Sequence, residues 1–223
     1  LSFLVHRICL SCRDAEKKEV PLALLKLLDG MRNQCSPKAA MDICDDLKLK
    51  LGFAKNTPAD YALGRSRLLE ALMNAAEGPL KDEVQKAFYI TLQNTGVMDT
   101  MLLKAPEDAT PLSLLDACPQ VGFEALPNFF SIECILGRYT FPLEADFSSL
   151  LTTQSAQGEE DNEYKLESIV VHSPGEIGHF KTFSRREVLV GNSTREMRWF
   201  KLECGTAELV SDADVSPFLD GRY

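Results

Sequence analysis

The segment Phe88-Tyr89-Ile90-Thr91-Leu92 marks the point at which the character of the sequence changes. It is short and rich in aromatic and β-branched residues, which favours a β-strand. Before it, apolar residues recur at the spacing of helices, and after it they gather in segments of strand length. Because helices come first and strands second, the sequence predicts an α+β fold.

Start and stop signals place most of the elements. The predicted helices are Val20–Met31 with Pro21 in its first turn, a helix capped by Ser36-Pro37 and ended by Gly52, a helix that starts at Thr57-Pro58, and Asp82–Phe88. Further strands are predicted at Phe129–Leu136, Tyr164–Val171, His179–Ser184, Glu187–Val190 and Trp199–Glu203, with one or two helical turns within Leu112–Ala117. A turn at Gly191-Asn192 fits the antiparallel pattern of the last strands.

The composition restricts the classes of partner. The 223 residues carry a formal net charge of -9, which opposes binding to a phosphate backbone and disfavours direct nucleic-acid binding. No apolar run approaches the roughly 20 residues that a membrane helix needs, so no membrane span is expected. The seven cysteines are odd in number and scattered, which predicts reduced thiols and an intracellular protein without resolving cytoplasm, nucleus or organelle.

Metal and cofactor signals are weak. Gly-rich phosphate-binding motifs do not occur, and only Cys9 and Cys12 have chelate spacing, with His6 nearby. A tetrahedral zinc site needs four ligands, so neither a metal nor a cofactor is predicted. Four cysteines fall on or beside apolar faces and are expected in the core as small hydrophobes, namely Cys35, Cys44, Cys118 and Cys134.

Three histidines are present, and their surroundings differ. His6 sits in an apolar stretch and is expected to pack. His172 closes a predicted strand, where a hydrogen bond at the strand end is the simplest role. His179 follows Gly178 and opens a strand after a loop, so its imidazole is the candidate for a cleft and for catalysis.

The order of several motifs is distinctive. Tyr164–Ser173 and Gly178-His179-Phe180 are followed by Trp199-Phe200-Lys201-Leu202-Glu203-Cys204, and upstream stand Val20–Leu24, Ser36–Ala39, Asp60 before Leu68-Leu69, Leu126–Ile132 and Tyr139–Pro142. In this order they resemble the ubiquitin-specific protease family of papain-like cysteine deubiquitinases. The resemblance covers nearly the whole chain.

The resemblance implies a papain-like fold in which a helical thumb precedes an antiparallel β palm. It places residues 1–88 in the thumb and 89–223 in the palm of a single domain, 1–223. It also implies roles for two side chains: His179 corresponds to the catalytic base, and Glu203 to the group that orients it.

This sequence departs from the family pattern at the nucleophile. The N-x-G-x-x-C box does not occur, and by register its cysteine would fall a few residues before Leu1. Glu203 stands where the family has Asp or Asn, and Cys204 replaces the next Asp. The segment between Phe88 and Leu126 is too short for the family's two long β-fingers, and their paired zinc cysteines are missing, so reduced fingers are expected.

The matches and departures together predict a catalytically inactive domain. Its expected role is that of a protein-interaction or structural subunit of a larger assembly, with His179 and Glu203 as vestiges of an active site. The alternative is an active cysteine deubiquitinase whose nucleophile lies upstream of Leu1 and whose base is His179. Ubiquitin binding without cleavage is a third reading, weakened by the short fingers, and an unrelated α+β domain is a fourth.

Overall fold

The computed structural model describes most of the chain. Its described residues are 1–33, 36–54, 60–92, 96–104, 110–118, 122–136, 138–151, 162–172, 180–191, 194–203 and 206–222. They form a mixed arrangement of helices and mainly antiparallel sheets. Two compact units result, one from residues 1–89 with 127–129 and the other from residues 90–126 with 130–223. The chain therefore changes from helix to strand after Tyr89.

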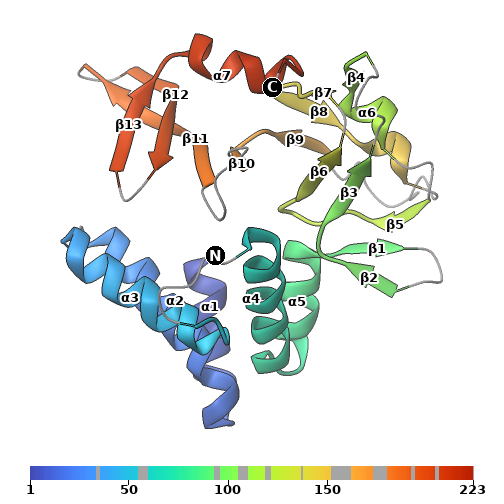
Figure 1. Cartoon of the computed structure of the whole chain (residues 1–223). Helices are drawn as coiled ribbons and strands as arrows, with labels where there is room; N and C mark the ends of the chain where they lie inside the picture. Colours follow the sequence, from blue (N-terminus) through green and yellow to red (C-terminus); the bar gives the residue numbers. More distant parts are fainter. Residues whose placement is uncertain are drawn as a thin grey trace. The chain divides into compact units, whose positions relative to one another are not determined.

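The first unit is helical (Figure 1). Its helices are α1 (Ser2–Ser11), α2 (Ala15–Arg32), α3 (Pro37–Lys50), α4 (Tyr61–Ala75) and α5 (Pro79–Phe88). The predicted start of α3 is confirmed, because the Ser36 hydroxyl accepts a hydrogen bond from the Ala39 amide at 3.3 Å. Its predicted end is confirmed as well: Gly52, at φ 78°, follows the last turn and donates its N–H to the Leu49 carbonyl at 2.9 Å.

Other helix starts were predicted wrongly. Helix α2 begins five residues before Val20, because Asp14 caps it by accepting hydrogen bonds from Glu16 and Lys17 at 3.0 and 3.3 Å. Pro21 consequently lies inside the helix instead of in its first turn. Helix α4 is capped by Asp60, whose carboxylate accepts from the Leu63 amide at 2.8 Å, and the expected cap at Thr57-Pro58 lies outside the described residues.

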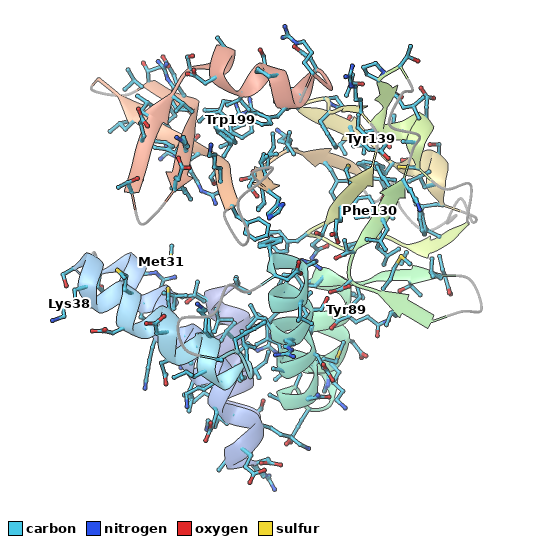
Figure 2. The ribbon with its side chains drawn as sticks, viewed as in Figure 1. Met31, Lys38, Tyr89, Phe130, Tyr139 and Trp199 are labelled. Atoms are coloured by element: carbon cyan, nitrogen blue, oxygen red, sulfur yellow. The ribbon has the colours of Figure 1, made fainter. Side chains whose placement is uncertain are left out.

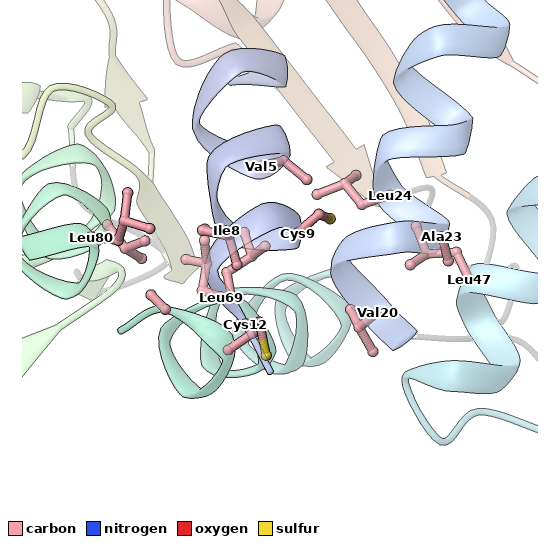
Figure 3. Packing of buried hydrophobic residues seen from close by; sticks show 14 residues of the cluster. Val5, Ile8, Cys9, Cys12, Val20, Ala23, Leu24, Leu47, Leu69 and Leu80 are labelled. Atoms are coloured by element: carbon pink, nitrogen blue, oxygen red, sulfur yellow. The ribbon is translucent and has the colours of Figure 1, made fainter. Parts of the chain in front are cut away.

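Helix α1 supplies the centre of the helical core. Val5 and Ile8 are fully buried, and Cys9 and Cys12 are nearly so. These positions recur at helical spacing and meet apolar residues of the other helices, among them Leu24, Leu69 and Leu80 (Figure 3).

His6 lies between these buried positions on the outer side of α1 and is exposed, so the expectation that it packs was wrong. Cys44 and Cys134 are exposed too, contrary to prediction. The apolar residues near Cys44 and Cys134 had indicated that these side chains point into the core.

A short extended segment, residues 127–129, belongs to the helical unit. The amides of Asn128 and Phe129 donate to the carbonyls of Lys86 and Ala87, each at 2.9 Å. The Phe129 ring stacks on Phe88 with centroids 5.6 Å apart. These contacts satisfy carbonyls in the last turn of α5 that have no partner within the helix.

The second unit is rich in strands. They are β1 (Ile90–Leu92), β2 (Gly96–Met98), β3 (Met101–Lys104), β4 (Leu112–Ser113), β5 (Phe123–Ala125), β6 (Ile132–Leu136), β7 (Tyr139–Thr140), β8 (Glu144–Asp146), β9 (Glu163–Lys165), β10 (Ser168–His172), β11 (Phe180–Val190), β12 (Thr194–Glu203) and β13 (Thr206–Val210). The helical elements are α6 (Leu114–Ala117), η1 (Ser148–Leu150) and α7 (Asp212–Leu219). The pairs β3–β6 and β4–β7 are parallel, so the expectation of a wholly antiparallel palm was wrong in part. Their connections are long enough for the crossover that parallel strands need.

The largest sheet has the strand order β10-β11-β12-β13 and is antiparallel. Helix α7 covers part of one face, where Val215 packs with Phe183 and Trp199 (Figure 2 labels Trp199). The register pairs Phe183 with Lys201 and Lys201 with Glu208, so these three side chains share that face.

Several predicted strands differ from those observed. The strand predicted at Phe129–Leu136 begins only at Ile132, as β6, and the one predicted at Phe88–Leu92 begins at Ile90, as β1. The predicted strand Tyr164–Val171 is interrupted at Leu166-Glu167, because the chain leaves β8 as a partner and joins β11. The predicted strands on either side of Arg185-Arg186 form one strand, β11. Within the described parts of the chain, no helix combines the length and apolarity required to cross a membrane.

The position of α1 in the core gives a stability test with an internal control. We expect Ile8→Ala to lower the free energy of unfolding by about 3 kcal/mol, because the fully buried side chain leaves a cavity. Leu10→Ala on the same helix removes a side chain that is 74% exposed and should cost less than about 0.5 kcal/mol. Urea denaturation of both variants measures the difference, and equal effects would contradict this placement of α1.

Candidate functional site

The predicted base, His179, lies outside the described residues. The next residue, Phe180, begins β11 and pairs with His172 at the end of β10. Their rings are in contact, with centroids 4.8 Å apart. The structure thus describes the strand ends on both sides of residues 173–179, and the predicted proximity of His179 to Glu203 stays a prediction.

Glu203, the predicted orienting group, ends β12 and is bound by two lysines. Its Oε2 lies 2.5 Å from the Nζ of Lys201, and its Oε1 lies 3.7 Å from the Nζ of Lys181. The Glu203 side chain is 21% exposed, so solvent screens these ion pairs only in part. Each carboxylate oxygen of Glu203 therefore has a lysine ammonium within ion-pair distance.

The two lysines reach Glu203 by different routes. Lys201 stands two residues before Glu203 on the same strand, and the two-residue period puts both side chains on one face. Lys181 comes from the neighbouring strand β11, whose register with β12 brings it beside Glu203. The sequence analysis missed both lysines. The alternation Lys-x-Glu at the end of β12 was a usable signal for Lys201, but Lys181 required knowledge of the register.

Beside this group the sheet face is hollowed into an open depression of roughly 410 Å³. Its lining includes Lys181, Lys201, Phe183, Phe218, Glu208 and Asp214. The Phe183 and Phe218 rings form an apolar part of the lining, with centroids 4.9 Å apart. The depression therefore combines aromatic surface with side chains of both charges.

The start of α7 fixes the acidic part of this depression. Asp214 accepts hydrogen bonds from the amide and the hydroxyl of Ser211, at 2.9 and 2.7 Å. These hydrogen bonds favour the ionised form and lower the pKa of Asp214. The capping box thus holds a carboxylate in place at the point where β13 passes into α7.

Three of the described thiols, those of Cys9, Cys12 and Cys118, are buried, which confirms the prediction for Cys118. Cys35, also predicted in the core, lies outside the described residues. Cys9 and Cys12 are each only 4% exposed. Burial raises the pKa of the Cys9 thiol, and Lys18 offsets part of that rise. Burial also raises the pKa of Cys118 to about 11. Where the structure describes the side chains, no group of three or more His, Cys, Asp or Glu residues is arranged to hold a metal ion.

No protein-family model matches this chain, and no curated protein matches it. The residues of the site are therefore identified from the structure and the sequence of this chain alone. The two lysines and Glu203 form an ion-paired group, and the depression beside it offers both apolar and charged surface to a side chain. This arrangement is suited to binding.

The ionic group around Glu203 can be tested through stability. Glu203→Gln leaves two partly buried ammonium groups without their carboxylate, and we expect the free energy of unfolding to fall by about 1 kcal/mol. The loss should shrink at about 1 M salt, which screens charges over roughly 3 Å. The control is Glu196→Gln, whose ion pair with Arg198 is more exposed and should contribute less than about 0.5 kcal/mol. A larger loss in the control would contradict the assignment.

Proposed function

We propose that this chain is a catalytically inactive relative of the ubiquitin-specific proteases that acts as a protein-interaction or structural subunit of a larger intracellular assembly. In this proposal the helical unit corresponds to the thumb and the strand-rich unit to the palm. His179 and Glu203 are then remnants of an active site. The proposal rests on the sequence resemblance, and one feature of the structure supports it in particular.

That feature is the pairing of Glu203 with lysines. A papain-like thiol protease needs a thiolate, an imidazole base and a third group that orients the imidazole. Both oxygens of Glu203 are engaged, by Lys181 and Lys201. A carboxylate in this position contributes to the ionic structure of the sheet, which supports a structural role for the residue in place of a catalytic one.

The buried thiols point in the same direction. Cys9 and Cys12 stand closest in sequence to the expected nucleophile, and both pack in the helical core. Burial raises the pKa of Cys9, which disfavours the thiolate that attacks a carbonyl. Among the described cysteines, Cys9, Cys12, Cys118 and Cys134 form no disulfide.

The proposal predicts the outcome of labelling with a ubiquitin probe that carries a C-terminal electrophile. We expect no covalent adduct with the protein, tested together with any residues that precede Leu1, because no activated thiolate is available. His179→Ala should leave this result unchanged and alter stability by less than about 1 kcal/mol. Intact-mass spectrometry measures the adduct, and an active deubiquitinase labelled in parallel controls for probe quality.

Formation of a covalent adduct would contradict the proposal. A covalent adduct that forms with the unaltered protein and disappears in His179→Ala would identify an active hydrolase. It would establish His179 as the base and place the nucleophile on a cysteine that tandem mass spectrometry identifies.

A further inference from the structure

Strand β13 forms an edge of the large sheet (Figure 1). It pairs with β12 through Thr206–Val210, and among the described residues no strand pairs with its other side. The N–H and C=O groups of alternate β13 residues therefore point away from the sheet. Four of its five residues are exposed, including Leu209 at 59%.

Strand β13 has few of the features by which proteins prevent an edge strand from pairing with another chain. Thr206-Ala207-Glu208-Leu209-Val210 holds neither proline nor lysine, and its pairing with β12 runs without a bulge. Glu208 is its one charged side chain. An edge of this kind favours the addition of an extended segment, because main-chain hydrogen bonds supply affinity without demanding a particular sequence.

The charged side chains beside β13 indicate which charge a partner segment carries. Glu208 lies opposite Lys201 in the register, yet the Lys201 ammonium is 2.5 Å from Glu203. Within the described part of the chain, Glu208 forms no ion pair, and Asp212 at the start of α7 forms none either. Glu208 and Asp214 line the same depression, so together with Glu203 three carboxylates stand against two lysines, and the surface around β13 keeps a negative charge.

The depression provides an anchor for one long side chain. Phe183 and Phe218 offer aromatic surface, and Glu208 and Asp214 lie on the same lining. An arginine fits this chemistry, because its aliphatic stem packs on aromatic rings while its guanidinium binds carboxylates.

We propose that the free edge of β13 binds an extended, arginine-containing segment of a partner protein by strand addition, with one arginine seated in the depression at Glu208 and Asp214. This inference rests on the proposed role as an interaction subunit and names the chemistry of one partner surface. The added strand completes the unpaired backbone of β13, and the depression fixes its register.

A second copy of this chain is a poorer occupant. Antiparallel pairing of two β13 strands across a twofold axis, with all five residues paired, places Glu208 opposite Glu208 of the other copy. Like charges directly opposite one another destabilise a strand pair. A partner with alternating arginines removes this repulsion and adds an attraction.

The test uses the full chain and a synthetic seven-residue peptide with arginine at alternate positions and valine between them. A matched peptide that is N-methylated at every residue keeps the charges and loses the main-chain donors, and a third peptide carries glutamate in place of arginine. Fluorescence polarisation measures binding, and hydrogen exchange measured by NMR reports on the β13 amides. We expect the arginine peptide to bind, to slow exchange in β13, and to bind about tenfold better than the N-methylated peptide.

Two charge variants separate the depression from general electrostatics. Glu208→Lys should weaken binding of the arginine peptide at least about tenfold, because it sets a like charge in the binding site. Glu187→Lys changes the charge of the protein equally, on the β11–β12 hairpin, and should alter binding by less than about twofold. Circular dichroism and urea denaturation confirm that both variants fold.

Several outcomes would overturn this inference. They are failure of the arginine peptide to bind, equal binding of the N-methylated peptide, preference for the glutamate peptide, equal effects of the two variants, and dimerisation with protection of β13 in the absence of peptide. Each can occur while the ubiquitin probe leaves the protein unlabelled. Conversely, an adduct with the probe refutes the inactive role, and the peptide measurement still reports independently on β13.

Discussion

Burial of one side of α1 is the constraint on which the helical unit depends. Val5, Ile8, Cys9 and Cys12 recur at helical spacing, and the inward faces of the other helices meet them. Leu69 and Leu72 of α4, for example, are separated by one turn and are almost fully buried. None of these helices has a second apolar face with which to build a core by itself, so the unit is organised around its first helix.

The sequence predicted element boundaries correctly where hydrogen bonds between residues close in sequence set them. Ser36-Pro37 specifies a helix start because the hydroxyl bonds an amide only three residues away. The start of α2 was missed because its first turns are polar and exposed, so apolar periodicity begins only at Val20. The signal that identifies this start is Asp14, whose cap needs no apolar residue.

Strand boundaries depend on partners that are distant in sequence. The break at Leu166-Glu167 follows from a change of partner, since the Leu166 amide bonds Leu143 whereas the Glu167 carbonyl accepts from Arg185. Within β11, Arg185-Arg186 resembled a loop because of its charge. Both faces of this part of the hairpin tolerate charge, and Arg186 is paired with Glu167. Neither result can be read from periodicity alone.

At the candidate site, too, some features depend on residues close in sequence and others on residues that are distant in sequence. The place of Glu203 at the end of a strand was predictable, because the aromatic segment before it is a strong strand signal. Its pairing with Lys181 required the register of two strands, and the depression required α7, which the sequence analysis had not predicted. The role that the resemblance implies for Glu203, to orient His179, stays a prediction, because His179 lies outside the described residues.

The charged side chains on this sheet face form two groups that lie within a few residues of one another. Glu203 takes both nearby lysines, so it becomes an internal part of the sheet. The same pairing leaves Glu208 uncompensated on the edge strand, although Lys201 lies directly across from it. The three carboxylates Glu203, Glu208 and Asp214 outnumber the two lysines, so the sheet face beside β13 keeps a negative charge that attracts a cationic partner.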